Sequence, residues 1–107
     1  MLGDDAPCAH VAALPAPADP RARGCEECLA AGTRWVHLRE CLECGHVGCC
    51  DSSQGKHATA HYHATRHAVI GSLEPGEAWG WCYADRVDFD LGYEPRTRMP
   101  PAARGGA

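Results

Sequence analysis

Residues 41–50, Cys-Leu-Glu-Cys-Gly-His-Val-Gly-Cys-Cys, decide the fold of this chain. Two residues between a pair of cysteines, as in Cys41 and Cys44, let both sulfurs reach one zinc ion from a single turn, each about 2.3 Å from the metal. A second such pair, Cys25 and Cys28, precedes this stretch, and a run of histidines follows it. Two cysteine pairs followed by a histidine cluster indicate a domain built on zinc.

Composition supports the need for metal. The chain has 107 residues, which is enough for one domain, and it carries eight cysteines and seven histidines but only one phenylalanine and two methionines. A domain of this size with so few large apolar side chains cannot easily offset the entropy of ordering by burial alone. We therefore expect disulfides or metal ions to hold it together.

Disulfides are the alternative to metal, and the N-terminal residues weigh against them. Residues 1–5 are acidic and lack the basic and apolar regions of a signal peptide, so we expect a cytoplasmic protein. Thiols stay reduced in the cytoplasm, where paired cysteines indicate metal sites. Histidines are needed for zinc but not for a disulfide framework.

Charge and hydropathy narrow the class of partner. The formal net charge of −4 gives no basic face for phosphate, so we expect no nucleic-acid partner. No apolar stretch is long enough to cross a membrane, and we expect no membrane partner. We expect a monomer.

The pattern of residues predicts a small zinc-stapled α+β domain, with a short antiparallel sheet packed on one main helix. Strands are expected at 34–40, 46–50 and 66–73, with one or two more in 78–91. The main helix is expected at 56–65, and a short helical turn at 29–32 ends at Gly32. Residues 11–24 are expected to form a loop. The domain is expected to span residues 1–93, followed by a disordered tail rich in Pro, Arg and Gly at 94–107.

Ligand counting is compatible with two tetrahedral zinc sites. His57 and His61 lie one helical turn apart, so they can bind one ion together or reach two different ions. Eight donors satisfy two such sites: Cys25, Cys28, Cys41, Cys44, Cys49, His57, His61 and His67. Because closed sets of four protein donors leave no position for a reactive water, we expect structural zinc and no enzyme activity.

Part of this pattern resembles a known family. The stretch from Cys44 to Cys49, then His57, His61 and His67, then Trp81-Cys82-Tyr83, resembles the UBP-type zinc finger. That module occurs in ubiquitin-specific proteases and in a cytoplasmic histone deacetylase. The similarity runs from about Cys8 to Phe89, and the chain's length and its use of Ala and Arg favour a stand-alone bacterial version.

The resemblance implies which donors share an ion. One site would use Cys25, Cys28, Cys49 and His57. A second would use Cys41, Cys44, His61 and His67. A third site, present in some members, would use Cys8, His10 and Cys82, with Asp85 where the family has a cysteine. A carboxylate can ligate zinc, so two zinc ions are expected and a third, more labile one is chemically allowed.

The resemblance also implies a binding pocket. In the family, aromatic walls enclose the C-terminal Gly-Gly of ubiquitin and an arginine meets its carboxylate. The corresponding aromatic residues here are Trp35, Trp81 and Tyr83, for which core packing is the alternative role. Asp51 occupies the place of the arginine, and a helix N-cap is its alternative role. Arg34, Arg39 or Arg86 could supply the missing positive charge.

The sequence therefore predicts a zinc-binding, non-catalytic interaction module that takes a protein C-terminal tail or a peptide. The alternative is a thiol-based redox or zinc-handling protein, which would use Cys50 and a labile third site. Cys50 is otherwise expected to be a small buried residue, and His46 and His63 are expected to be exposed. His37 would replace Cys41 as a ligand if Cys41 pointed away.

Overall fold

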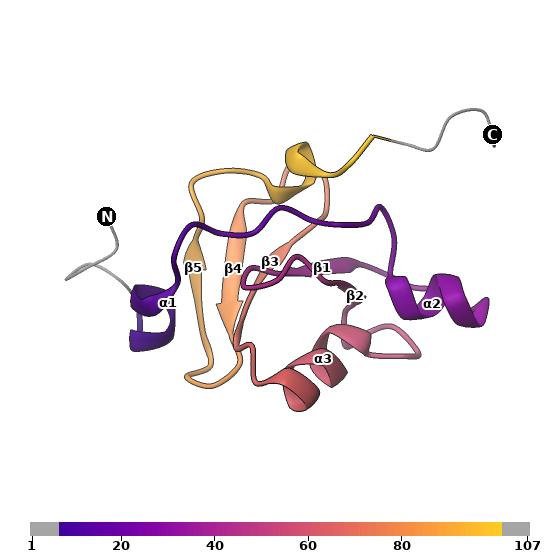
Figure 1. The fold of residues 1–107 in the computed structure, drawn as a ribbon, viewed down its shortest axis with the longest axis horizontal. Coiled ribbons are helices and arrows are strands. Elements are labelled where there is room, and N and C mark those ends of the chain that lie inside the picture. The colour runs from indigo at the N-terminus through magenta and orange to yellow at the C-terminus, as the bar shows by residue number, and fades with distance from the viewer. Residues whose placement is uncertain (1–6, 102–107) are drawn as a thin grey trace.

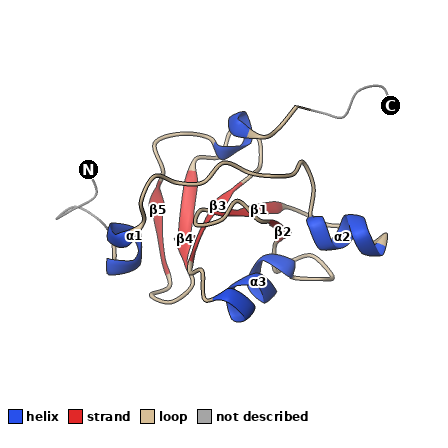
Figure 2. Ribbon diagram, viewed as in Figure 1, coloured by secondary structure: helices blue, strands red, loops and turns tan. Residues whose placement is uncertain are grey.

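The computed structural model describes residues 7–101 as one five-stranded antiparallel sheet with short helices around it (Figures 1 and 2). The sheet order is β2-β1-β3-β4-β5. The strands are β1 Leu38–Cys41, β2 Val47–Cys49, β3 Val69–Ser72, β4 Trp79–Cys82 and β5 Val87–Asp90. The helices are α1 Ala9–Ala13, α2 Glu26–Ala31, α3 His57–Thr65 and the 3-10 helix η1 Pro95–Arg98. The predicted α+β class is confirmed, and the predicted strands form, each shorter than expected.

The two faces of the sheet have different surroundings. In Figure 1, α3 lies below the sheet, whereas η1 and the segment that follows α1 cross above it. Pairing of Cys41 with Ile70 and of Ile70 with Trp81 places these three residues on one face. Arg39 and Trp79, each two residues away on the same strands, share that face. The sheet therefore presents a cation and two indoles on one side.

The main helix approaches β2 through a glycine. A Cβ added at Gly48 would lie 2.6 Å from the backbone nitrogen of Ala58, so only glycine allows this contact. Ala58 is itself buried against the strand. This close packing directs His57 and His61, on either side of Ala58, toward the cysteines of β1 and β2.

The second helix begins inside the first cysteine pair. The Sγ of Cys25 accepts a hydrogen bond from the backbone N–H of Cys28 at 3.4 Å and so caps α2. Gly32 ends the helix with φ of 74°, as predicted from the sequence, because this conformation strains residues with a Cβ. The cysteine pair is therefore part of the helix start.

The apolar core is small and partly made of cysteine. One cluster contains Leu38, Val47 and Leu73 together with the buried side chains of Cys25, Cys28 and Cys49. A second cluster contains only Val11, Leu42 and Val69, with partly buried neighbours around it. A core this thin agrees with the need for metal inferred from composition.

Two segments differ from the sequence expectation. Residues 9–13 form α1, which overlaps the start of the loop expected at 11–24. The helix forms there because Val11 is buried and the N–H of Ala12 bonds to the carbonyl of Cys8. Residues 95–98 form η1 with Pro95 buried, inside the segment expected to be a disordered tail. The rest of that expected tail, residues 102–107, lies outside the described residues.

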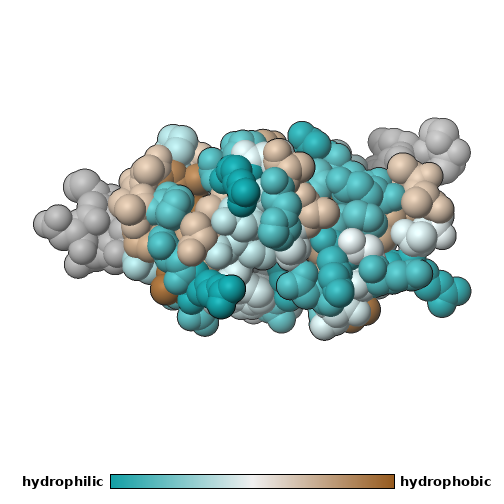
Figure 3. All heavy atoms as spheres, turned by 90° about the horizontal axis from the view of Figure 1, so that it is seen from below, coloured by the Kyte–Doolittle hydropathy of each residue, from teal (hydrophilic) through white to brown (hydrophobic). Residues whose placement is uncertain are grey.

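The surface that carries α3 is mainly hydrophilic, with apolar side chains scattered over it (Figure 3). Across residues 7–101, every helix is too short or too polar to cross a bilayer. The apolar side chains of this domain are thus concentrated around the cysteines and under the crossing segments.

Candidate metal centres

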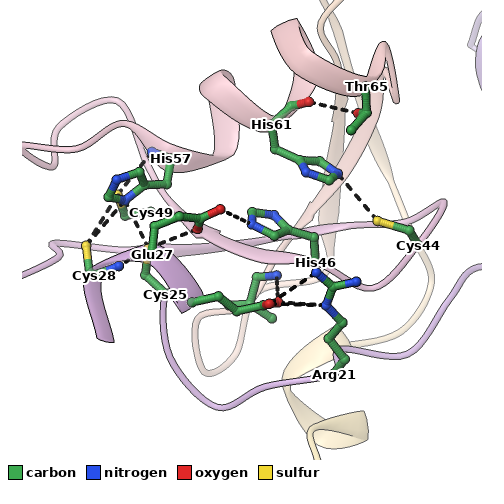
Figure 4. A network of polar contacts seen from close by, with 12 residues as sticks. Arg21, Cys25, Glu27, Cys28, Cys44, His46, Cys49, His57, His61 and Thr65 are labelled. Atoms are coloured by element: carbon green, nitrogen blue, oxygen red, sulfur yellow. Dashed lines mark hydrogen bonds and ion pairs between the residues drawn. The ribbon is translucent and has the colours of Figure 1, made fainter. Parts of the chain in front are cut away.

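The first cluster of donors lies between α2, β2 and the start of α3. The Nδ1 of His57 is 3.2 Å from Cys25 Sγ, 3.5 Å from Cys28 Sγ and 3.3 Å from Cys49 Sγ. The sulfurs of Cys28 and Cys49 are 3.9 Å apart. Figure 4 shows the imidazole of His57 pointing into the group of sulfurs. All three cysteines are completely buried.

The second cluster lies between the β1–β2 turn and the far end of α3. Cys41 Sγ is 3.6 Å from Nδ1 of His67, and Cys44 Sγ is 3.4 Å from Nε2 of His61. One donor atom from each of these four residues lies within 4.8 Å of the others. His57 and His61 therefore point at two different clusters, which settles the alternative that helical spacing left open.

The third cluster joins the two ends of the domain at its surface. Cys8 and His10 come from α1 and the residue before it, whereas Cys82 and Asp85 come from the end of β4 and the turn after it. Nδ1 of His10 lies 2.8 Å from Oδ2 of Asp85, and Cys82 Sγ is 3.8 Å from the same oxygen. His10 and Asp85 are exposed, unlike the ligands of the first cluster.

The first two clusters have the dimensions of a tetrahedral zinc site. Zinc bond lengths give about 3.6 Å between a sulfur and a nitrogen ligand and about 3.8 Å between two sulfurs. The distances within both clusters lie close to these values. In the third cluster the His10–Asp85 distance is that of a direct hydrogen bond. The first two donor sets therefore fit zinc without rearrangement, and the third fits it once this bond opens.

The pKa shifts in the first two clusters favour a bound metal cation. Burial raises the pKa of Cys25 and of Cys41 to about 12, so their thiolate forms need a compensating positive charge. Burial and the neighbouring His46 lower the pKa of His61. This favours the neutral imidazole that ligates metal. A hydrogen bond from His10 lowers the pKa of Asp85, which keeps that carboxylate ionised.

A groove of about 330 Å³ lies beside these clusters. Its lining comes from β1, β3 and β4 and from the loop after β2: His37, Arg39, Cys50, Asp51, Ser52, Ile70, Trp79, Trp81 and Tyr83. The Arg39 guanidinium carbon stands 4.7 Å from the centre of the Trp79 ring. Thr59 on α3 donates to Oδ1 of Asp51 at 2.6 Å. The groove combines aromatic walls with one cation and one anion.

Comparison with known proteins identifies the zinc fold. The family zf-UBP, described as "Zn-finger in ubiquitin-hydrolases and other protein", matches residues 25–90, which is more than half of the chain. The chain belongs to the zf-UBP family. The matched region contains both buried clusters and the groove, and it begins after Cys8 and His10. Zinc is therefore the cofactor of this domain, with two or three clusters able to hold it.

Two named relatives are much longer than this chain, and each matches it over a short part of its own length. Ubiquitin carboxyl-terminal hydrolase 16 of rat and of mouse are each 37% identical to this chain over 62 residues. The match covers 55% of this chain but only 7% of each hydrolase. The solution NMR structure of protein RPA1320 from Rhodopseudomonas palustris is 56% identical, with a TM-score of 0.73. That similarity covers 88% of this chain and 87% of the other.

The structure places three further residues for which the sequence analysis gave a role or an exposure. Trp35 packs against the first apolar cluster and is not among the groove residues, so core packing describes it better than ligand binding. Asp51 lines the groove, and the residue before α3 is Lys56, so an N-cap role for Asp51 is wrong. His46, expected to be exposed, is 3% exposed and contacts Glu27.

The remaining sequence expectations concern single side chains. His63 is exposed, and Cys50 is buried, both as predicted. His37 lies 3.9 Å from Cys50 Sγ, whereas Cys41 points into the second cluster. His37 therefore does not replace Cys41 in the structure.

The sequence analysis did not single out Trp79 as a groove residue, although strand periodicity could have done so. Trp79 stands two residues before Trp81, and alternate residues of a strand share a face. Arg39 reaches the same face only through the pairing of β1 with β3 and β4. That pairing is a property of sheet order and is not visible in local sequence.

Proposed function

We propose that this zf-UBP domain is a non-catalytic, cytoplasmic interaction module whose groove binds the C-terminal tail of a partner polypeptide. In this proposal zinc is purely structural and is held by the three clusters described above. Each cluster supplies four protein donors, so the metal adds rigidity to the groove walls and takes no part in a reaction.

The observation that carries the proposal is a pair of opposite charges that do not pair with each other. Within residues 7–101, neither Arg39 nor Asp51 forms an ion pair with any residue, although both line the same small groove. Thr59 fixes Asp51, and Trp79 underlies Arg39. Unpaired charges held on aromatic walls favour a ligand that brings the complementary charges.

A polypeptide terminus has the required chemistry. Its carboxylate can accept two hydrogen bonds from the Arg39 guanidinium, a geometry that arginine favours. A lysine or arginine shortly before the end of the tail can approach Asp51. Arg39, on strand β1, thereby supplies the positive charge that the family's arginine provides. In this chain, the place of that arginine is taken by Asp51. The hydrolases to which the domain is similar are named for the C-terminus of ubiquitin.

A peptide titration tests this proposal. Fluorescence anisotropy would compare a labelled peptide ending in Arg-Gly-Gly with a free carboxylate and the same peptide with an amidated end. We expect amidation to weaken binding by about tenfold or more, because one charge-assisted bond is worth about 1.5–3 kcal/mol. Arg39→Ala should weaken the free peptide to a similar extent and leave the amidated one unchanged.

Two further variants make the test specific to the groove. Trp81→Ala removes an aromatic wall and should weaken both peptides. Arg34→Ala removes an exposed arginine that does not line the groove and should change neither. Equal affinity for the free and amidated peptides in the wild type would reject tail recognition.

Cys50 supports a second candidate function, in zinc handling or thiol redox chemistry. It is the one cysteine of the eight that belongs to no cluster, and it opens onto the groove beside His37. Peroxide titration with a zinc-sensitive dye would distinguish the two. Zinc release at mild oxidant in the wild type, absent in Cys50→Ser, would favour this candidate over the binding module.

A further inference from the structure

The two residues between the cysteines of the first pair both bond to residues that lie just after the second pair. Glu26 Oε2 accepts a hydrogen bond from the backbone N–H of Val47 at 2.9 Å. Glu27 Oε2 accepts one from Nε2 of His46 at 2.7 Å. Consecutive residues of one zinc-binding turn are thus bonded to consecutive residues that follow the other zinc-binding turn. Figure 4 shows the contact between Glu27 and His46.

Both carboxylates are fixed in place. Arg21 holds Glu26 with three hydrogen bonds, two from Nε at 2.9 and 3.2 Å and one from Nη2 at 3.1 Å. Glu27 lies in the turn of the first cluster, with Oε1 3.9 Å from the Sγ of Cys25. The positions of these side chains therefore depend on the geometry of the Cys25–Cys28 turn.

His46 passes this restraint to the second cluster in two ways. Its ring stacks on the ring of His61 with centroids 4.0 Å apart and planes 6° from parallel. Its backbone carbonyl accepts from the N–H of Cys41 at 2.8 Å. His46 is only 3% exposed, so it has little room to move while Glu27 holds it. Two donors of the second cluster are therefore positioned by a residue bonded to the first.

We propose that Glu26, Glu27 and His46 form a clamp that couples the first and second zinc sites, so that an ion in either raises the affinity of the other. An ion in the first cluster fixes the Cys25–Cys28 turn and, through the clamp, the rings of His46 and His61. The second ion then meets donors that are already ordered, which lowers the entropy cost of binding. Coupling of this kind is reciprocal.

Zinc loading followed by native mass spectrometry tests the clamp. The full chain carrying Asp85→Ala, in which the third cluster is disabled, would be loaded with half the zinc that its two buried sites need. Coupling of about 100-fold between equal sites keeps singly loaded molecules to about a tenth of the total, whereas independent sites give about half. We expect the lower value.

Substitutions in the clamp should raise that singly loaded fraction. Glu27→Ala and His46→Ala should each increase it about threefold or more, and the double variant should go no further, because both remove the same connection. Glu27→Gln keeps an acceptor for His46 and should lie between the wild type and Glu27→Ala. It also serves if an alanine variant fails to fold.

A matched control is present in the second cysteine pair. Glu43 lies between Cys41 and Cys44, and its Oε2 accepts a hydrogen bond from the backbone N–H of Ala68. Ala68 directly follows His67, a donor of the second cluster. Glu43→Ala should weaken the second site alone. Its effect should therefore add to that of Glu27→Ala, unlike the effects of the two clamp substitutions, which should not add. Statistical loading of the Asp85→Ala chain, or an identical singly loaded fraction in that chain with and without the clamp substitutions, would overturn the proposal.

Discussion

The first and third clusters use similar donors in opposite surroundings. Cys25, Cys28 and Cys49 of the first are completely buried, and the nearest apolar side chains pack against them. His10 and Asp85 of the third are exposed and bond to each other. Burial raises the pKa of Cys25, so its thiolate form depends on a cation. The exposed pair, His10 and Asp85, can bond to water as well as to each other. Zinc is thus part of the core at the first cluster, whereas at the third it would link α1 to the turn after β4.

The largest effect should follow from removing a sulfur of the first cluster. Cys28→Ser should lose the ion there and unfold the domain, because structural zinc contributes on the order of 10 kcal/mol to folding. Circular dichroism and native mass spectrometry would measure both. Cys50→Ser, at a buried cysteine outside the clusters, should keep its metal and its fold. A Cys28→Ser protein that lost zinc but stayed folded would show that the core does not depend on the ion of the first cluster.

The next effect concerns the apolar anchor of the third cluster. Val11 on α1 is 1% exposed and packs with Leu42 and Val69, so it fixes the helix that carries His10. Val11→Ala should cost about 1–3 kcal/mol in free energy of unfolding, measured in denaturant. It should also lower retention of one zinc ion while the other two remain. An unchanged ion count with the expected destabilisation would show that α1 stays in place without this contact.

A smaller effect should follow from removing the carboxylate ligand. Asp85→Ala should release the third ion at a chelator concentration that leaves the wild type fully loaded. The fold should survive, since this exposed side chain contributes no apolar packing. Native mass spectrometry gives the count and circular dichroism the fold. Loss of all metal together would mean that the three clusters form one unit.

The smallest change in stability is expected from Asp85→Cys. A thiolate suits zinc better than a carboxylate does, so the third ion should resist higher chelator concentrations than in the wild type. The thermal midpoint should rise by no more than a few degrees. If the third ion is lost as easily as before, exposure of the cluster and not its ligand type sets its lability.

The sequence predicted the donors better than it predicted their surroundings. The spacing of the cysteines identified the two pairs. The resemblance assigned histidines to each pair, and the structure brings the same residues together. Periodicity predicted α3 to within one residue, whereas the strands at 34–40, 46–50 and 66–73 were predicted too long. Local pattern gave no sign that His46 is buried, because its partner Glu27 lies nineteen residues earlier in another turn. Trp35 and Arg39 show the same limit, since their surroundings depend on sheet order and on the crossing segments.

The separation of the third cluster along the chain has a consequence for synthesis. A ribosome releases the chain from its N-terminus, so Cys8 and His10 emerge first and Cys82 and Asp85 emerge last. During most of translation the early pair has only two donors to offer a metal ion, whereas both buried clusters are complete once His67 has emerged. The nascent domain should therefore close around its inner ions first, and the strand that ends at Cys82 should complete the third cluster with α1 afterwards.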